Sequence, residues 1–553
     1  MSSTATSPAR GQFDVIVVGA GFAGLYAVHR LRDEMGLSVQ ALEMGTDVGG
    51  TWYWNRYPGA RCDIESVHYS YSFSDDLHKE WTWSERYAAQ PEILRYLQYV
   101  ADRFDLRRSF KFETKVTAMR WDEATSLWHV TTDDGATITA RFVVTGVGNV
   151  SVAHVPDFPG HEKFKGTVYH TSTWPHEGVD FTGKRVAIIG TGASAIQAIP
   201  LIAKEAAHLT IFQRTPNYVG PLRNEPLKTE KMEEARSKYP ALRKAARNHY
   251  IGVPYEFTAM TADSVPADER KKIYDKAWAD GGFHVLMSTF GDILIDKGAN
   301  ETVADYVRDR IREEVEDPKV AEMLCPTDHF YGTKRPTFGT GYYETFNRSN
   351  VTLVDLRETP ITEFFDGGIR TGDAQYDVDV VVFATGFDAI TGPLLKLNIT
   401  GRNGVTLGER WADGPHSYLG IATHGFPNLF TITGPQSAVA LYNNPLAIED
   451  HVEFVSDMIK YMDARGYTTM EANAVAESDW GKFVLDMADQ TLFPQTRSWY
   501  MGDNVPGKPH VCMIYVGGAP EYRKICTDIA ADGYRGFTLA SASQAAQRVV
   551  AAQ

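Results

Sequence analysis

Cysteine is scarce in this chain, and its four cysteines are far apart. Cys62, Cys325, Cys512 and Cys526 stand alone, and no two of them form a C-x-x-C pair. A redox-active disulfide or a cysteine-rich zinc site needs such pairs, so the sequence argues against a disulfide reductase and against a bound metal. Widely spaced free thiols are typical of a reducing compartment, and we expect a cytoplasmic protein.

Long apolar runs and excess positive charge are also missing. The sequence contains no run of about 18 or more apolar residues, so we expect no membrane-spanning helix. Its 70 acidic residues outnumber its 55 basic ones, and the net charge of −15 disfavours binding to nucleic acid or to an anionic membrane. A chain of 553 residues is too long for one core and is expected to form two or three domains.

A first dinucleotide site is predicted near the N-terminus. Residues 13–19 are a β-branched apolar run typical of a buried parallel strand, and a glycine-rich loop follows. Gly19 allows a tight turn, Gly21 lets the backbone approach a pyrophosphate, and Gly24 lets a helix pack on the strand. Glu43 ends the next strand, where an acid can bind ribose hydroxyls. A glycine turn that merely capped a helix would not need this acid.

A second loop of the same kind follows the apolar strand at 185–190. Its turn carries small or polar residues, namely Gly190, Thr191, Gly192 and Ser194. Where the first unit has Glu43, this unit has Gln213 and Arg214. An acid repels a 2′-phosphate and an arginine can pair with it, so we expect FAD at the first loop and NADPH at the second. The alternative is that Arg214 is a solvated charge at a strand end.

The stretch between the two loops contains the pattern F-x-G-x-x-x-H-x-x-x-W-P. It consists of Phe164, Gly166, His170, Trp174 and Pro175. Taken singly, these residues could be ordinary packing residues of a buried linker. The whole pattern resembles the fingerprint of the type I Baeyer–Villiger monooxygenases, which use FAD, NADPH and dioxygen to convert ketones into esters or lactones. Related flavin-containing and N-hydroxylating monooxygenases usually lack the Trp–Pro end.

A second signature of that family resembles the segment from Gly50 to Asp63, with the spacing G-x-W-x-x-x-x-Y-P-G-x-x-x-D. Without the resemblance, it is a glycine- and proline-rich loop with aromatic packing. The resemblance implies that Gly50, Thr51 and Trp52 contact the flavin and that Asp63 lies near its ring. It also implies that the backbone near Val116 contacts the adenine.

Three later segments take their expected roles from the resemblance. Lys334 should help recognise the 2′-phosphate, and Arg335 should lie beside the flavin and the nicotinamide, although adjacent cations are more often solvated. Trp499 should reach the NADP. A loop that faces the substrate in relatives matches Ser437, Ala440 and Leu441.

The resemblance implies a definite chemistry. NADPH reduces FAD, dioxygen forms a C4a-peroxyflavin, and the deprotonated peroxide attacks a ketone, which rearranges to an ester. A fixed guanidinium at Arg335 would keep the peroxide anionic, and Asp63 would hold Arg335 in place. His170 and Trp174 would couple the domains. The alternatives are a flavin-dependent N- or S-monooxygenase and a non-catalytic NADP-sensing flavoprotein.

The predicted fold is α/β, with two Rossmann-like dinucleotide-binding domains and a helical insertion in the NADP domain. We expect residues 1–152 and 390–553 to bind FAD, residues 153–222 and 333–389 to bind NADP, and residues 223–332 to form the insertion. Within it, Val303, Val307 and Ile311 have helical spacing, with Asn300 as a possible N-cap. Residues 376–386 are predicted to form a buried strand that ends in a small-residue turn. We expect a small ketone and O2 as partners, with no obligate protein partner.

Overall fold

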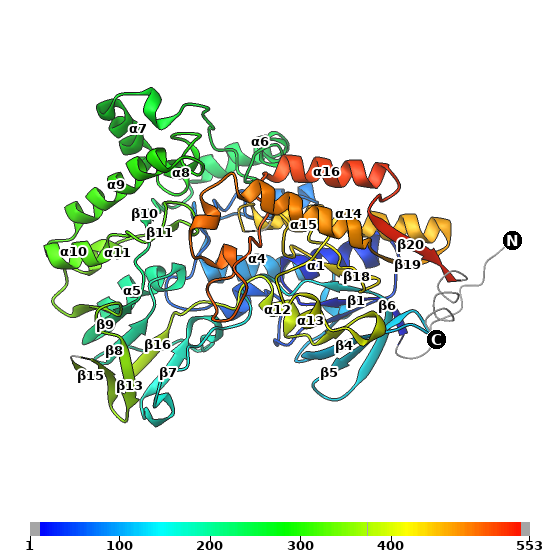
Figure 1. Ribbon diagram of the computed structural model, residues 1–553, viewed down its shortest axis with the longest axis horizontal. Helices are drawn as coiled ribbons and strands as arrows, with labels where there is room; N and C mark the ends of the chain where they lie inside the picture. The colour runs from blue at the N-terminus through cyan, green and yellow to red at the C-terminus, as the bar shows by residue number, and fades with distance from the viewer. Residues whose placement is uncertain (1–11, 373, 439, 543–553) are drawn as a thin grey trace.

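The computed structural model describes residues 12–372, 374–438 and 440–542, and the chain is built around two sheets (Figure 1). The sheet that contains β1 lies at the right of the figure, and the sheet that contains β8 lies at the left. Green helices of the middle of the chain extend above the left-hand sheet. The fold is the predicted α/β class with two Rossmann-like units.

The first sheet contains eight strands within the described residues. Its β1 strand is buried on both faces: Val15 and Val17 join one apolar cluster, and Ile16 and Val18 join another. Strand β1 (Gln12–Val18) belongs to a parallel part of the sheet that also contains β2 (Val39–Leu42), β3 (Phe110–Lys111), β6 (Thr137–Thr145) and β18 (Leu429–Thr431). Strands β4 (Val116–Asp122) and β17 (Ile399–Thr400) also run in the direction of β1, whereas β5 (Leu127–Thr132) pairs antiparallel with both β4 and β6. Because β18 pairs with β6, both ends of the chain build this sheet.

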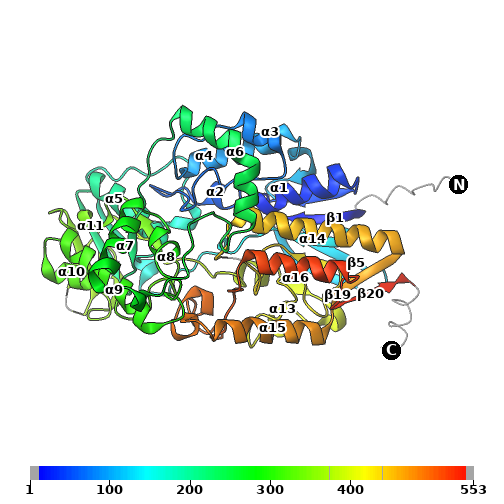
Figure 2. The same cartoon turned by 90° about the horizontal axis from the view of Figure 1, so that it is seen from above.

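Helices cover the first sheet and bring in the C-terminal part of the chain. Helix α1 (Phe22–Val28) packs against α14 (Asn444–Arg465), which packs against α16 (Ala519–Ala531), and Figure 2 shows the three side by side. Helix α14 has proline in its first turn and ends at Gly466, whose φ of 71° suits a glycine C-cap. Other helices are α2 (Thr51–Trp54), α3 (Asp75–Glu80), α4 (Gln90–Arg103), α12 (Gly392–Leu395), α13 (Leu407–Arg410) and α15 (Ala474–Ala488).

The second sheet is fully parallel in the order β12, β9, β8, β16, β7. Its strands are β7 (Thr167–His170), β8 (Arg185–Ile189), β9 (His208–Gln213), β12 (Val351–Asp355) and β16 (Val380–Phe383). Helix α5 (Ala193–Glu205) follows β8 directly, as in a dinucleotide-binding unit. The motif stretch of Phe164 to Pro175 therefore supplies an edge strand of this sheet.

The segment 376–386 contains the predicted buried strand and leaves it after Phe383, but its first residues belong to a separate strand. The segment forms β15 (Gln375–Asp377), which pairs with β14 (Gly368–Thr371), and then β16, which pairs with β8. The chain changes partners at Asp379, whose carboxylate accepts hydrogen bonds from the backbone and the guanidinium of Arg185. Strand β13 (Ile361–Phe365) completes the small antiparallel sheet, and β19 (Tyr467–Ala472) pairs with β20 (Phe537–Ser541).

The insertion is helical, as predicted. It consists of α6 (Thr229–Arg247), α7 (Ala267–Asp280), α8 (His284–Met287), α9 (Lys297–Glu314) and α10 (Pro318–Leu324). The chain enters it from β10 (Val219–Pro221) and leaves it into β11 (Thr337–Gly339), and these two strands pair in parallel. Helix α11 (Tyr342–Thr345) follows. The paired entry and exit strands bring the two ends of the insertion together.

Asn300 is not the N-cap of α9. The helix begins earlier, and Asp296 caps it by accepting a hydrogen bond of 2.8 Å from the Ala299 backbone. Asn300 is fully buried. Its side chain donates hydrogen bonds to the carbonyls of Ile293 and Tyr331 and accepts one from the Tyr331 amide. It therefore anchors the backbone just before Lys334 and Arg335.

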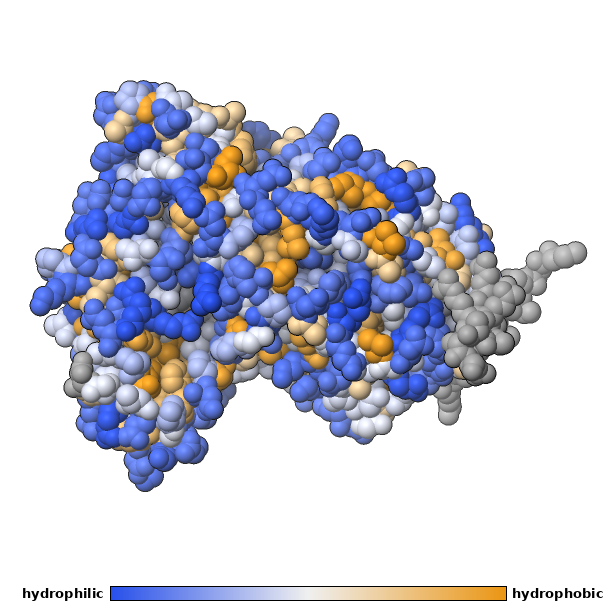
Figure 3. Space-filling view, viewed as in Figure 1, coloured by the Kyte–Doolittle hydropathy of each residue, from blue (hydrophilic) through white to orange (hydrophobic). Residues whose placement is uncertain are grey.

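The surface seen in Figure 3 is largely hydrophilic, and its apolar residues gather in separate patches. Within the described ranges, no helix has both the length and the apolar composition that crossing a membrane requires. The same residues contain no group of three or more His, Cys, Asp or Glu placed to hold a metal ion.

Candidate active site

The first glycine loop leaves no room for side chains at two of its positions. A Cβ at Gly24 would lie 1.8 Å from the Gly19 carbonyl oxygen, and one at Gly19, where φ is 103°, would lie 2.5 Å from the Gly146 carbonyl. Gly21 lies against Gly50, so the loop meets the second predicted flavin segment. The bare backbone surface formed here fits the close approach of a pyrophosphate.

Glu43 ties the end of β2 to this loop. Its carboxylate accepts hydrogen bonds from the backbone amides of Ala20, at 2.8 Å, and Gly45, at 2.7 Å. The side chain is buried, and burial raises its pKa while the backbone hydrogen bonds oppose that effect. An ionised carboxylate has capacity for further hydrogen bonds, so Glu43 can still accept from ribose hydroxyls. Val116 begins β4 and is buried near the same end of the sheet.

Asp63 and Arg335 form a bidentate ion pair. The Arg335 Nε lies 3.0 Å from Asp63 Oδ2, and its Nη2 lies 2.8 Å from Oδ1. Its third nitrogen, Nη1, donates to the Ala440 carbonyl at 2.6 Å. Burial lowers the pKa of Arg335, but the Asp63 carboxylate outweighs burial, and the pKa is raised above its usual value. Arg335 therefore remains cationic at every pH that the protein tolerates.

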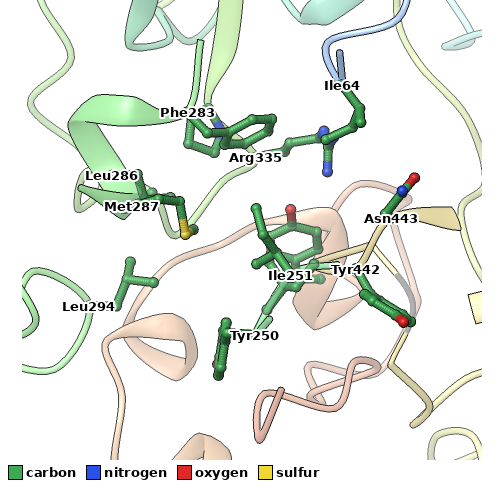
Figure 4. A pocket seen from close by; sticks show the side chains of 14 residues that line it. Ile64, Tyr250, Ile251, Phe283, Leu286, Met287, Leu294, Arg335, Tyr442 and Asn443 are labelled. Carbon is green, nitrogen blue, oxygen red and sulfur yellow. The ribbon is translucent and has the colours of Figure 1, made fainter. Parts of the chain in front are cut away.

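Arg335 borders a cavity of about 490 Å³, a volume that includes its opening to solvent. Figure 4 shows Arg335 and Phe283 on one side of the cavity and Tyr250 and Tyr442 on the other. Most of the lining is apolar or aromatic: Ile64, Tyr250, Ile251, Phe283, Leu286, Met287, Leu294, Leu441, Tyr442 and Tyr500. A cavity lined mostly by apolar and aromatic side chains, with few polar groups, is typical of a site for a small organic molecule.

The three residues expected to contact substrate have different positions. Leu441 lines the cavity, and Ala440 holds Arg335 through its carbonyl. Ser437 is fully buried and is not among the lining residues. Its hydroxyl donates a hydrogen bond to the Gly434 carbonyl within the turn. Sequence motifs did not point to the cavity residues from the insertion, such as Ile251 and Met287.

The second glycine loop lies beside two cations. Thr191 donates through its hydroxyl to the Thr215 carbonyl at 2.8 Å, which fixes the loop next to the end of β9. Arg214 is exposed at that end. Burial lowers the pKa of Lys334, the Asp328 carboxylate opposes that effect, and the charge of Arg214 adds to it, so Arg214 acts electrostatically on Lys334. Gly192 has open space around it.

The side chains of Lys334 and Arg335 have different neighbours. They follow a turn at residues 331–333. Lys334 lies near Arg214, whereas Arg335 binds Asp63. The adjacent cations therefore face the two different nucleotide units.

The fingerprint residues lie on and beside β7. Phe164 packs near Phe364, and a Cβ at Gly166 would lie 2.4 Å from the Asp379 carbonyl. His170 ends β7, where its Nδ1 lies 2.7 Å from the Ser172 hydroxyl, and burial lowers its pKa.

Trp174 is buried between Tyr169 and Phe181. After Pro175, the ring of His176 contacts Tyr53, so this stretch joins the second unit to the first.

The Y-P-G part of the second signature also joins the two units. Tyr57 donates to the Gln197 side chain on α5 at 2.9 Å. Gly59 packs so closely on α5 that a Cβ would lie 2.4 Å from the Gln197 carbonyl oxygen. Within the same signature, Trp52 is buried and donates to the Tyr69 hydroxyl. Ser194 lies on α5 close to Tyr57. Trp499 is partly buried, and its ring centroid lies 4.4 Å from that of Tyr500.

Comparisons with known proteins agree with this architecture. Residues 12–223 match the profile of the flavin-binding monooxygenase-like family. A Baeyer–Villiger monooxygenase of Pseudooceanicola batsensis is 44% identical over 531 residues, which is 96% of each chain.

Two solved structures are similar over nearly the whole chain. A steroid monooxygenase bound to NADP is 49% identical, with a TM-score of 0.91 over 96% of this chain and 100% of that one. OTEMO in complex with FAD and NADP is 42% identical, with a TM-score of 0.93 over 97% and 100%. This chain therefore belongs to the Baeyer–Villiger monooxygenases, the flavin enzymes that use NADPH and O2 to convert ketones into esters or lactones.

Proposed function

We propose that the cavity beside Arg335 is where a neutral, apolar ketone receives one oxygen atom of O2 and becomes an ester or lactone. The observation that carries this proposal is a permanent cation, held by Asp63, at the edge of an apolar cavity. NADPH supplies the two electrons that reduce the second oxygen atom to water, so the reaction balances.

The residues of both loops fit the two cofactors of the family, FAD and NADP. The FAD would lie on Gly19, Gly21 and Gly24, where the absence of side chains exposes the backbone, and Glu43 would bind its ribose. The segment Gly50–Trp52 and Asp63 would contact the flavin.

The NADP would lie on the second loop, from Gly190 to Ser194. The side chains of Arg214 and Lys334 would bind its 2′-phosphate, because phosphate is recognised best by converging cations. Trp499 would contact it from the C-terminal part of the chain.

Bound FAD, once reduced by NADPH, supplies the activated oxygen. Arg335 would place its positive charge where negative charge develops on that oxygen, and it cannot lose the charge by deprotonation. Asp63 and the Ala440 carbonyl accept hydrogen bonds from all three guanidinium nitrogens, so the group does not need to reorganise during the reaction. The apolar walls would exclude water.

The cavity also favours a class of substrate. Among the described lining residues, Arg335 is the one charged side chain, and it is already paired with Asp63. A carboxylate or ammonium group on the substrate would lose its hydration here without gaining a partner. We therefore propose an uncharged ketone, with the exact ketone to be found by experiment.

We further propose that the chain divides at the expected bounds. Residues 1–152 and 390–553 would form the FAD-binding domain, residues 153–222 and 333–389 the NADP-binding domain, and residues 223–332 the insertion. The pairing of β18 with β6 and of β16 with β8 supports this division. The four free, buried cysteines support a cytoplasmic location.

A substrate panel tests the proposal. The purified FAD-loaded enzyme would receive NADPH and, in separate reactions, neutral ketones, keto acids, a tertiary amine and a sulfide, with products identified by mass spectrometry. We expect an ester or lactone from neutral ketones and little product from keto acids. Efficient N-oxide or sulfoxide formation without ester would instead support a heteroatom monooxygenase.

A further inference from the structure

Three tyrosines line the cavity beside Arg335, and two of them use their hydroxyl groups elsewhere. Tyr250 donates its hydroxyl to the Val516 carbonyl. The Tyr442 hydroxyl accepts a hydrogen bond from Arg523 at 2.7 Å, and in Figure 4 it points away from Arg335. Neither hydroxyl is free to bind a molecule in the cavity.

The third tyrosine, Tyr500, differs from the other two. Its side chain is fully buried, and its hydroxyl has no hydrogen-bond acceptor among the described residues, although the Arg335 guanidinium lies close enough to act as a donor to it. A buried polar group without a partner costs free energy, so such groups in folded proteins require an explanation. The ring is held in place by contacts with Phe493 and Trp499.

Arg335 is a charged neighbour of the Tyr500 hydroxyl, and it limits which groups can accept the hydroxyl proton. The positive charge of Arg335 lies close enough to oppose the effect of burial on the Tyr500 hydroxyl, and the net pKa is still raised, to about 12. The phenol therefore keeps its proton at neutral pH. A guanidinium has only donors, so Arg335 cannot accept that proton, which remains available to an acceptor in the cavity.

We propose that the Tyr500 hydroxyl donates a hydrogen bond to the carbonyl oxygen of the ketone, an inference that depends on the function proposed above. A neutral ketone has one strong acceptor, and Tyr500 supplies an unused donor in a cavity that is otherwise mostly apolar. The hydrogen bond orients the carbonyl so that its carbon is exposed to the activated oxygen. As that oxygen adds, negative charge grows on the carbonyl oxygen, and a fixed donor stabilises it without transferring the proton.

Infrared spectroscopy of a bound ketone tests the hydrogen bond without turnover. Cyclohexanone labelled with ¹³C at the carbonyl would be added to the oxidised, FAD-loaded enzyme, and the carbonyl stretch would be compared with that in an apolar solvent. We expect a shift to lower frequency in the wild type and loss of the shift in Tyr500→Phe. Tyr250→Phe is the matched control: it removes a hydroxyl that is already bonded to Val516, so the shift should persist.

Kinetics give a second measurement. We expect Tyr500→Phe to lower kcat/KM for the ketone by about 10- to 100-fold, the range for loss of one donor to a developing charge, while NADPH still reduces the flavin. If Tyr500→Phe does not fold, 3-fluorotyrosine at position 500 replaces it. Its more acidic hydroxyl should move the carbonyl stretch to still lower frequency.

The outcomes separate the two proposals. If the wild type binds and oxidises ketones but Tyr500→Phe retains both the frequency shift and kcat/KM, the role of Tyr500 is refuted and the cavity assignment stands. Likewise, no change with 3-fluorotyrosine would refute it. A wild type that neither binds nor oxidises a ketone would contradict the ketone site itself, and the role of Tyr500 with it.

Discussion

The carboxylate of Asp63 and the guanidinium of Arg335 share two hydrogen bonds, although 272 positions separate the two residues in the chain. The pair joins a segment of the first nucleotide unit to the exit from the helical insertion. It thereby places a permanent positive charge at the edge of the cavity where we expect the ketone.

Replacing Arg335 tests the need for that charge. We expect Arg335→Ala to retain FAD and to be reduced by NADPH, but to form ester at least about 100-fold more slowly, as for loss of a fixed stabilising donor. Arg335→Lys should not restore activity, because a lysine cannot make the bidentate contact with Asp63 and also reach Ala440. Stopped-flow measurement of flavin reduction, alongside product yield, separates the two half-reactions. Ester formation by Arg335→Ala at the wild-type rate would refute the role.

Arg214 and Lys334 should set the preference for NADPH over NADH. Loss of either cation removes one charge-assisted contact with the 2′-phosphate, so each alanine variant should raise KM for NADPH by about 10-fold or more and leave KM for NADH unchanged. Lys204→Ala, which removes an exposed cation from the far end of α5, serves as the control. Equal effects on both coenzymes would contradict a phosphate-binding role.

The glycines of the two loops should respond differently to a methyl group. Gly24→Ala would force a Cβ to within 1.8 Å of the Gly19 carbonyl, so we expect little folded, FAD-containing protein. A Cβ at Gly192 meets nothing within 4 Å, so Gly192→Ala should fold and hold FAD normally. It should weaken only NADP binding, because the methyl group would lie where the coenzyme's pyrophosphate approaches the loop. Flavin content and thermal unfolding without NADP measure the first effect, and KM for NADPH measures the second.

His451 should make the folded protein sensitive to acid. It is buried between the Thr433 amide and the Tyr522 hydroxyl, and burial lowers its pKa from 6.5 to about 4. The unfolded chain therefore binds a proton that the folded chain does not, and stability is lost as the pH falls from about 6.5 to about 4. The loss is on the order of 3 kcal/mol for this group.

The variant His451→Gln cannot titrate, so it isolates this contribution. Thermal unfolding of both proteins should show a gap in Tm at neutral pH that narrows as the pH approaches 4. A gap that stays constant over this range would show that His451 does not account for the acid sensitivity.

Local patterns in the sequence determined the two nucleotide loops and the fold class. Gly24 is required by a contact within its own loop, with the Gly19 carbonyl, and the buried strands before each loop are apolar runs. The close contact of Gly19 with the Gly146 carbonyl, by contrast, depends on how β1 pairs with β6. Patterns of this kind lie within one continuous stretch of sequence and can be recognised there. The same holds for the helical character of residues 223–332, although the N-cap of α9 proved to be Asp296 and not Asn300.

The tertiary structure alone decided which side chains share the cavity. Tyr250, Phe283 and Tyr500 come from three distant segments and belong to no local pattern, so their meeting depends on how the insertion packs against the C-terminal part of the chain. Packing likewise removed Ser437 from the cavity wall and left the Tyr500 hydroxyl without an acceptor for its proton among the described residues. Local sequence patterns largely determine the loops, because the residues that form them are close together in the chain. A cavity forms only where segments that are distant in sequence pack together and leave space between them.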